Sequence, residues 1–206
     1  SKYRNSGQTC ICANRILVQE GVYDEFVEKL KDVVGTFKVG DGMDETSTHG
    51  PVITRKALDD IKSMVDDAVA HGAEVAAGGS FGEDDSHFIE PTILCDVTDD
   101  MRVFKEEIFG PVAPIFKFST EEEAIAMAND TEFGLASYLY SNDQGRCWRV
   151  AEAIDYGMVG VNETMISSEL IPFGGVKESG LGREGSRYGI EEYLELKYIC
   201  MGNLAR

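Results

Sequence analysis

The chain has 206 residues, of which 43% are hydrophobic and 27% are charged, so it is long enough to form one globular domain with its own core. Its 37 acidic and 19 basic residues leave a formal net charge of -18, which repels phosphate backbones and anionic headgroups and argues against nucleic-acid and membrane partners. No apolar run reaches the roughly 20 residues of a membrane-spanning helix. The cysteines number five, and an odd number does not resemble a disulfide framework, so we expect a reducing, cytoplasmic setting.

Strands and helices are expected to alternate along the first part of the chain. A β-branched segment at 16–18 predicts a strand, and apolar residues at helical spacing from Val22 to Val33 predict a helix directly after it. A second amphipathic helix, from Leu58 to Ala68, is expected to end near Gly72 and to lead into a short apolar strand at 73–77.

The same alternation continues in the second part of the chain. Thr120 and Glu123 form a capping box that predicts the start of a helix over 124–128. A strand at 135–140, a helix at 144–154 and a strand at 158–161 follow. This order predicts an α/β fold with three layers, αβα, in which helices cover both faces of a mainly parallel sheet. We assign residues 1–190 to this domain.

The last 16 residues, 191–206, are expected to form a separate strand and tail. Leu194, Leu196, Tyr198 and Cys200 point to one side of an extended segment, and the residues between them point to the other side. Such a strand can pair with another chain and serve oligomerisation. It can equally be an edge strand of this domain's own sheet, and the alternation alone fits both interpretations.

Cys10 is the first candidate for chemistry. Gly7 allows a flat ligand to approach the backbone just before it, and a thiolate is a strong nucleophile. A lone cysteine, however, is more often a small buried hydrophobe. Only the sequence around Cys10 can favour a nucleophilic role over that structural one.

Four short motifs give Cys10 this context. They are NSGQTC at 5–10, EEIFGP at 106–111, PFGG at 172–175 and SGLGRE at 179–184. In this order and rough spacing, the chain resembles the aldehyde dehydrogenases from Tyr3 to about Gly202, and it is most similar to the succinate-semialdehyde dehydrogenases, whose ending resembles 192–198. The resemblance implies the catalytic-domain fold of that family, with a terminal strand that joins subunits into a homodimer or homotetramer.

The resemblance also implies a reaction, the oxidation of succinate semialdehyde to succinate with NAD or NADP. Cys10 would attack the aldehyde carbonyl to form a thiohemiacetal, a hydride would pass to the nicotinamide, and water would hydrolyse the resulting thioester. The backbone N–H of Cys10 would bind part of the developing oxyanion, and an upstream asparagine would supply the second donor.

Five other residues match positions with a role in the family. Glu107 would accept hydrogen bonds from the nicotinamide ribose and Phe109 would pack near the nicotinamide ring, although a solvated charge and an ordinary core aromatic are the alternatives. Arg4 and Ser167 would bind the distal carboxylate of the substrate, with a surface salt bridge and a turn hydroxyl as the alternatives. Phe173 would line the mouth of the active site.

The remaining thiols and imidazoles carry weaker signals. Cys12 lies two residues after Cys10, and this spacing suits a small, strained and reducible disulfide that could act as an oxidative switch. A passive buried thiol at Cys12 is at least as compatible with the sequence. The other three cysteines and the three histidines show no ligand spacing, so we expect no structural metal.

Part of the family's machinery is expected outside this chain. In the family, the dinucleotide-binding half and the glutamate general base precede the nucleophile, so the partner of this domain would be that half, and the chain alone would not turn over aldehyde. The choice between NAD and NADP would lie there as well. The alternatives to a succinate-semialdehyde enzyme are a dehydrogenase of glutarate semialdehyde or another aldehyde, and a non-enzymatic oligomerisation or redox-sensing module.

Overall fold

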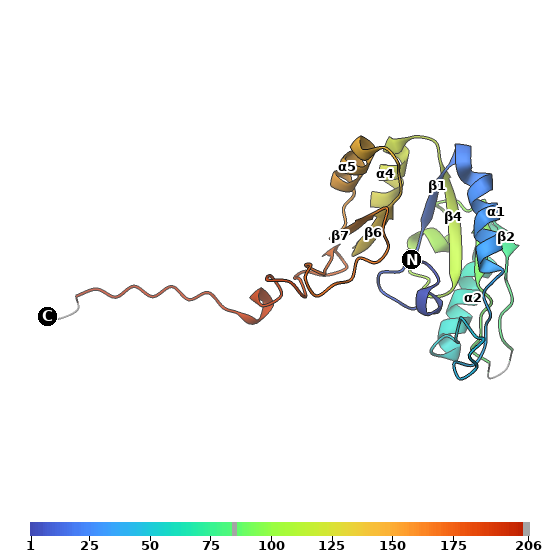
Figure 1. Ribbon diagram of the computed structural model, residues 1–206, viewed down its shortest axis with the longest axis horizontal. Helices are drawn as coiled ribbons and strands as arrows, with labels where there is room; N and C mark the ends of the chain where they lie inside the picture. The colour runs from blue at the N-terminus through green and yellow to red at the C-terminus, as the bar shows by residue number, and fades with distance from the viewer. Residues whose placement is uncertain (84–85, 204–206) are drawn as a thin grey trace.

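A four-stranded sheet carries most of the buried core in the computed structural model, which describes residues 1–83 and 86–203 (Figure 1). Its strands lie in the order β1-β4-β3-β2. β4 pairs in parallel with both β1 and β3, whereas β2 pairs antiparallel with β3. The strands are β1 (Ile16–Gln19), β2 (Glu74–Ala77), β3 (Thr92–Cys95) and β4 (Val112–Phe118).

Helices cover both faces of this sheet. α1 (Tyr23–Val34) packs with Ile93 and Ile115 on one face, and α2 (Arg55–Ala70) packs with Leu94 on the other. The two clusters separate because successive side chains of a strand point to opposite faces. The short α3 (Arg102–Lys105) joins the α2 side. The expected αβα layers and mainly parallel pairing are therefore confirmed.

The helix starts follow the sequence signals. The Thr54 hydroxyl accepts a hydrogen bond from the Ala57 N–H at the start of α2, at 3.2 Å. At the start of α4 (Glu121–Asn129), the Thr120 hydroxyl accepts from the Glu123 N–H at 3.2 Å. The Glu123 carboxylate accepts from the Ser119 N–H at 2.7 Å, so the return bond of the capping box lies one residue earlier than in the usual motif.

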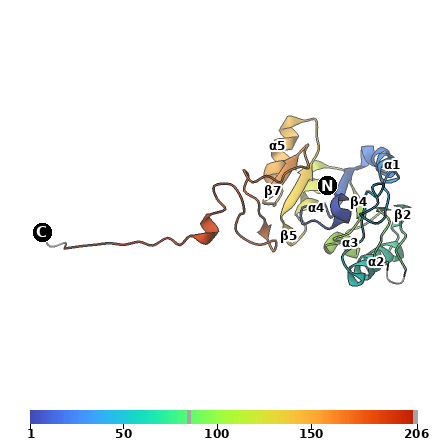
Figure 2. The ribbon, with the colours of Figure 1, turned by 60° about the horizontal axis from the view of Figure 1, so that its bottom comes forward.

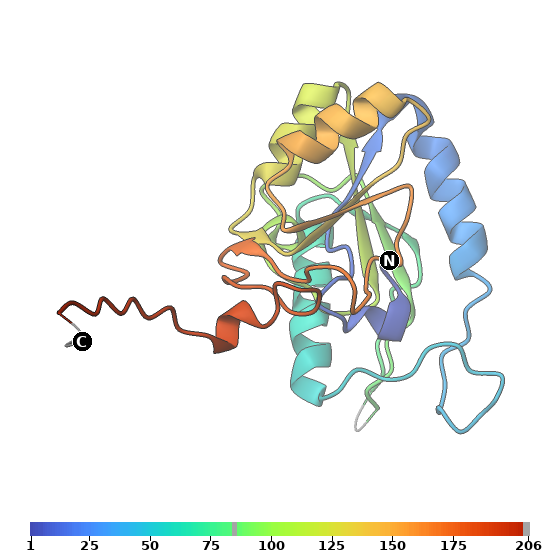
Figure 3. The same ribbon diagram turned by 60° about the vertical axis from the view of Figure 1, so that its left-hand side comes forward.

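The second half of the chain forms a smaller layer next to the main sheet (Figures 2 and 3). β6 and β7 pair in parallel, and α5 packs against both strands and against α4. β5 and β8 form a short antiparallel pair. The strands and helix expected at 135–140, 144–154 and 158–161 are confirmed. These elements are β5 (Phe133–Gly134), β6 (Ala136–Leu139), α5 (Gln144–Ala153), β7 (Met158–Val161) and β8 (Val176–Lys177).

Sequence patterns did not indicate the two most central strands, β3 and β4. All four residues of β3 are buried, so its two faces show no polar alternation. β4 contains Pro114, which lacks an N–H and is unusual in the middle of a sheet, yet it pairs in register with Leu94.

The chain ends in an extended stretch that leaves the body of the molecule (Figure 1). After the 3-10 turn η3 (Glu191–Tyr193), residues 194–203 are exposed and contain no assigned strand, and Leu196 is fully exposed. The interpretation as an edge strand of the domain's own sheet is therefore wrong for these residues, because none of them pairs with β1 or β2. Pairing with another chain and the boundary at 190 remain predictions. The last part of that predicted tail, 204–206, lies outside the described residues.

Candidate active site

The loop around Cys10 begins with a left-handed turn. In the 3-10 segment η1 (Arg4–Gly7), Asn5, Ser6 and Gly7 have φ angles of 51°, 54° and 76°, a region that non-glycine residues rarely adopt. The Gln8 N–H donates to the Asn5 carbonyl at 3.1 Å and closes the turn. A Cβ atom at Gly7 would lie 2.1 Å from the Gly110 carbonyl oxygen, so only glycine allows the two backbones to approach this closely.

Two side chains of this nucleophile loop, which we define as residues 3–14, fix it to the segment before α2. The Ser6 hydroxyl donates to the Gly50 carbonyl at 2.8 Å. The Gln8 amide accepts from the Ile53 N–H at 2.9 Å and donates to the Pro51 carbonyl at 3.3 Å. These long-range bonds hold a conformation that the backbone of the loop disfavours.

Asn14 joins the loop to the EEIFGP motif. Its amide donates to the Glu106 carbonyl at 2.8 Å and accepts from the Ile108 N–H at 2.9 Å. Phe109, the next residue, has a φ of 49° and a ring that is 42% exposed, an unusual combination for a bulky aromatic side chain. The resemblance named neither Asn14 nor the bonds of Gln8. In the sequence, only their positions inside or beside matched motifs could have indicated that Gln8 and Asn14 stabilise this loop.

Tyr138 on β6 connects the smaller layer to the loop. Its hydroxyl donates to the Ile11 carbonyl at 2.7 Å. Burial raises the pKa of Tyr138 to about 12; the nearby Cys12 and Cys10 raise it slightly further, whereas the Arg4 guanidinium acts in the opposite direction. The guanidinium and both thiols therefore lie close enough to this phenol to interact with it electrostatically.

Cys10 is exposed, as a nucleophile requires, and both loop cysteines are free thiols. Within the part of the chain that the structure describes, the Cys10 N–H has no hydrogen-bond acceptor, so it can donate to an oxyanion. Cys12 is half-buried, and its Sγ donates to the Arg4 carbonyl at 3.6 Å. Arg4 itself is exposed and makes no side-chain ion pair among the described residues, which leaves its guanidinium available to an anion.

Glu107 lies near a buried lysine that sequence reasoning did not select. Lys2 is only 6% exposed, and burial lowers its pKa to about 8, while nearby Cys12 and Glu107 act in the opposite direction. Glu107 itself is exposed. The charged and polar residues around Lys2 show no pattern that predicts burial, so this feature could be found only in the structure.

Ser167 and Phe173 are placed less directly. Ser167 is exposed, and its neighbour Ile166 packs over Gly160 beside the ring of Tyr138, which places this loop near Tyr138. Phe173 is half-buried, and its backbone exchanges two hydrogen bonds with Glu184, at 2.9 and 2.7 Å. Among the described residues, no hydrogen bond links either side chain to Arg4 or Cys10. The structure thus groups Gly7, Arg4, both thiols, Glu107 and Phe109, and leaves these two at the periphery.

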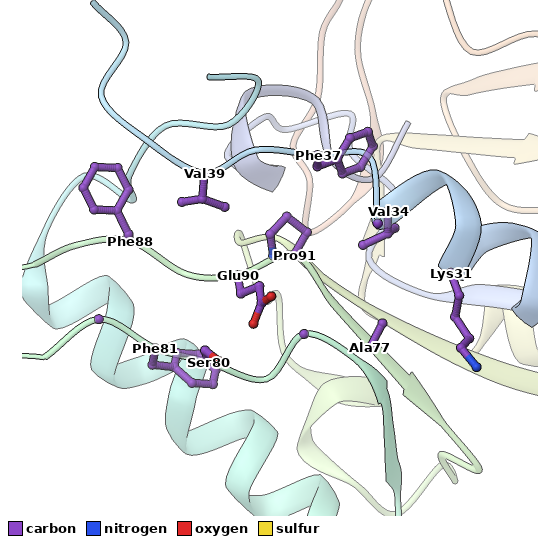
Figure 4. A pocket seen from close by; sticks show the side chains of 13 residues that line it. Lys31, Val34, Phe37, Val39, Ala77, Ser80, Phe81, Phe88, Glu90 and Pro91 are labelled. Carbon is purple, nitrogen blue, oxygen red and sulfur yellow. The ribbon is translucent and has the colours of Figure 1, made fainter. Parts of the chain in front are cut away.

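A cavity of about 470 Å³ lies elsewhere in the molecule (Figure 4). It lies between the end of α1 and the segments that flank β2 and precede β3, where Phe81, Phe88 and Pro91 line it. None of the candidate residues contributes to its wall. Cavity size therefore does not identify the candidate site, whose thiol is exposed.

The described ranges 1–83 and 86–203 contain no group of three or more His, Cys, Asp or Glu side chains placed to hold a metal ion. None of their helices combines the length and apolar character needed to cross a membrane.

Comparison with known proteins gives consistent matches over almost the whole chain. The model of the "Aldehyde dehydrogenase family" matches residues 1–199. The glutarate-semialdehyde dehydrogenase of Pseudomonas putida is 59% identical over 201 residues, which are 98% of this chain and 42% of that protein. The NADP(+) succinate-semialdehyde dehydrogenase of Escherichia coli is 55% identical over 202 residues, again 98% of this chain and 42% of the relative.

Solved structures agree with these matches. A succinate-semialdehyde dehydrogenase from Burkholderia pseudomallei has a TM-score of 0.94 and 56% identity, over 98% of this chain and 42% of that one. A betaine aldehyde dehydrogenase from Staphylococcus aureus, in complex with NAD+, has a TM-score of 0.88 and 40% identity, over 93% of this chain and 39% of that one. The chain spans about two fifths of the length of these relatives.

Proposed function

The chain belongs to the aldehyde dehydrogenase family, and we propose that it is the catalytic part of an NAD(P)-dependent semialdehyde dehydrogenase whose nucleophile is Cys10. One observation carries the proposal. A left-handed turn, fixed by Ser6, Gln8 and Asn14, presents an exposed thiol and a backbone N–H that has no acceptor among the described residues, and Tyr138 interacts electrostatically with both this thiol and the guanidinium of Arg4.

The proposed chemistry begins at the sulfur of Cys10. Its thiolate adds to the aldehyde carbon to form a C–S bond, and the Cys10 N–H donates to the oxygen that becomes negative. A bound nicotinamide cofactor would supply the hydride acceptor that the resulting thiohemiacetal on Cys10 needs to become a thioester. Water then cleaves the C–S bond, which yields the carboxylic acid and returns the thiol.

The groups that would orient the cofactor lie beside the loop. Glu107 is exposed and can accept hydrogen bonds from ribose hydroxyls, and the exposed ring of Phe109 can contact an aromatic ligand. Both follow α3 and are held by the Asn14 bridge to the nucleophile loop. NAD and NADP are equally compatible with this half of the site, because neither residue would contact the adenosine ribose.

Arg4 would select the substrate class. In a chain of net charge -18, an anionic substrate has to be attracted locally, and an exposed guanidinium near the nucleophile supplies that attraction. Ser167 and Phe173 would complete the substrate site from the smaller layer. Succinate semialdehyde is the proposed substrate. Glutarate semialdehyde is the second candidate, because a relative at 59% identity bears that name and the two substrates differ by one methylene.

Substitution of Arg4 in the full-length protein tests the substrate assignment. Arg4→Ala should lower kcat/KM for succinate semialdehyde by about a hundredfold and leave a neutral aldehyde of similar length within about threefold. Arg146→Ala, which removes an exposed guanidinium on α5, is the matched control. Equal losses for charged and neutral aldehydes would reject a carboxylate-binding role. The wild-type ratio of kcat/KM for the two semialdehydes separates the two candidates.

A disulfide between Cys10 and Cys12 remains a secondary proposal. Cys12 is half-buried and lies two residues from the exposed nucleophile, so oxidation could join the two thiols and block the reaction reversibly. Mild peroxide should then remove two hydrogens from the peptide that contains both cysteines, and a reductant should restore activity. Absence of that mass change, with activity unaffected, would favour a passive thiol.

The remaining parts of the proposal concern the whole protein. The chain would work with a dinucleotide-binding half in a cytoplasmic homodimer or homotetramer, with residues 194–203 adding a strand to a partner. Aldehyde oxidation by the 206 residues alone is expected to be undetectable, because the general base and most cofactor contacts would lie elsewhere. Ordinary dehydrogenase rates from the isolated chain would reject this division of the site.

A further inference from the structure

Cys10 lies at the tip of a tight turn within the nucleophile loop. The Cys12 N–H donates to the Thr9 carbonyl at 2.9 Å, so Cys10 and Ile11 are the two central residues of this turn. The peptide groups here are trans, so the N–H and the carbonyl of each group point in opposite directions. The Cys10 N–H, which has no acceptor among the described residues, shares a peptide group with the Thr9 carbonyl that closes the turn.

Tyr138 extends this arrangement from the smaller layer. Its hydroxyl donates to the Ile11 carbonyl at 2.7 Å, and that carbonyl shares a peptide group with the Cys12 N–H. A series of hydrogen bonds therefore runs from the Tyr138 hydroxyl through the Ile11–Cys12 and Thr9–Cys10 peptide groups, and it ends at the Cys10 N–H. Hydrogen bonds in such a series polarise one another, so the bond from Tyr138 makes the Cys10 N–H a stronger donor.

The surroundings of Tyr138 fix the position of its ring. Tyr138 on β6 pairs with Gly160 on β7, and a Cβ atom at Gly160 would lie 2.8 Å from Cδ1 of the ring, so a larger residue would displace it. Ile11 is 7% exposed, and a buried carbonyl depends on a protein donor. β6 lies beside the N-terminal loop in Figure 1, and the hydroxyl reaches the turn across the boundary between the two layers.

We propose that Tyr138 is a positioning residue for the oxyanion: through the turn, its hydroxyl orients and polarises the Cys10 N–H that binds the developing negative charge. This inference rests on the proposed function, in which addition of the thiolate and hydrolysis of the thioester both place negative charge on the oxygen. Tyr138 acts through the backbone of the turn. Its pKa of about 12 keeps the hydroxyl protonated, and hence a donor, at neutral pH.

A second tyrosine supplies a control for a purely structural role. The Tyr156 hydroxyl also donates to a backbone carbonyl at 2.7 Å, that of Ala128 on α4, and it accepts a weaker bond from Arg15 at 3.4 Å. Both tyrosines are half-buried. Tyr156→Phe should therefore lower the thermal unfolding temperature at least as much as Tyr138→Phe does, although its hydroxyl makes no bond to the nucleophile loop in the described structure.

Kinetics of the full-length protein give the first test. Tyr138→Phe should lower kcat and kcat/KM for the preferred semialdehyde equally, by about tenfold, because the lost interaction acts in the transition state. Tyr156→Phe should remain within about twofold of the wild type. Alkylation of Cys10 by iodoacetamide develops no oxyanion, so its rate should change by less than about twofold in both variants. Equal losses of kcat/KM in the two variants, or a slower alkylation that matches the fall in kcat, would overturn the inference.

Amide hydrogen exchange in the 206-residue chain gives a second test that needs no activity. Without the Tyr138 hydroxyl, the turn should open more often, and exchange at the Cys12 N–H should accelerate about fivefold. Exchange at the Ile108 N–H, which bonds to the Asn14 side chain, should not change. Unchanged exchange at Cys12 would contradict the role of Tyr138.

Cys10→Ala distinguishes failure of this inference from failure of the proposed function. If the full-length Cys10→Ala variant still oxidises aldehyde, the nucleophile assignment fails and the inference fails with it. If that variant is inactive while Tyr138→Phe behaves like Tyr156→Phe, only the role of Tyr138 is rejected.

Discussion

The nucleophile loop and the C-terminal stretch of residues 191–203 are both irregular, but they differ in what holds them. The loop has three successive residues in the left-handed region, and hydrogen bonds to segments 44, 45, 92 and 94 residues away in the chain stabilise it. The C-terminal stretch has no such bonds beyond its 3-10 turn, and its apolar side chains are exposed. A strained conformation at a site is thus maintained by the fold, whereas an exposed apolar segment indicates a surface that another chain can cover.

The largest expected effect is the difference in free energy of unfolding between a variant of the buried core and a variant of the C-terminal stretch. Leu94 on β3 is fully buried in the core cluster that faces α2, so Leu94→Ala should lower the free energy of unfolding of the 206-residue chain by about 2–5 kcal/mol. Leu196→Ala, in the exposed stretch, should change it by less than about 0.5 kcal/mol. Urea unfolding measures both values. A cost of more than about 2 kcal/mol at Leu196 would show that the stretch packs on its own chain.

Gly7→Ala tests the backbone strain in the loop. The new Cβ would meet the Gly110 carbonyl and would carry a positive φ angle, so we expect a loss of about 2–3 kcal/mol in the free energy of unfolding. Gly21→Ala is the matched control, because no atom lies within 4 Å of its added Cβ and its φ is not positive. Urea unfolding of both variants should differ clearly, and equal stability would mean that the loop relaxes freely.

Asn14→Ala sharpens the same comparison with a smaller effect. It removes two hydrogen bonds between the loop and the EEIFGP motif, which should cost about 1–3 kcal/mol. Asn142→Ala, at an exposed asparagine without a hydrogen bond in the described structure, should be nearly neutral. Hydrogen exchange should increase at Ile108 in the first variant and not in the second. Unchanged protection at Ile108 would argue against the bridge.

The smallest expected effect is a pH dependence at His49, which packs against Tyr3 and Phe37 at the start of the loop. Burial lowers the pKa of His49 from its usual 6.5, so the folded chain holds the neutral ring and the unfolded chain takes up the proton first. This contribution to stability is complete above pH 6.5 and is lost as the pH falls through the folded pKa. His49→Phe should therefore lose less stability on acidification than the wild type in the same urea titration. An equal loss of stability on acidification in the two proteins would show that His49 does not contribute to this pH dependence.

The sequence predicted the fold well where side chains alternate in polarity. α1 and α2 were expected from apolar residues at helical spacing, α4 from its capping box, and β7 from a compact apolar run. β3 and β4 could not be predicted in this way, because they are buried on both faces and β4 contains a proline. Burial from both sides depends on helices that are distant in the chain, which a local pattern does not reveal.

The residues of the candidate site were selected from matched motifs, whereas the contacts that support them were not indicated by the sequence. Cys10, Arg4, Glu107 and Phe109 followed from matched motifs, and the structure brings them into one region. The bonds of Asn14, the hydroxyl of Tyr138 and the burial of Lys2 depend on segments that meet only after folding.

Thiol reactivity tests the central claim most directly, namely that the nucleophile loop makes Cys10 an accessible attacking group. The 206-residue chain is treated with a limiting amount of iodoacetamide at neutral pH, and mass spectrometry follows the alkylation of all five cysteines. Cys10 should react well before the buried Cys95 and Cys147, because the loop holds its thiol at the surface. A Cys10 that reacts no faster than the buried Cys147 would contradict the account.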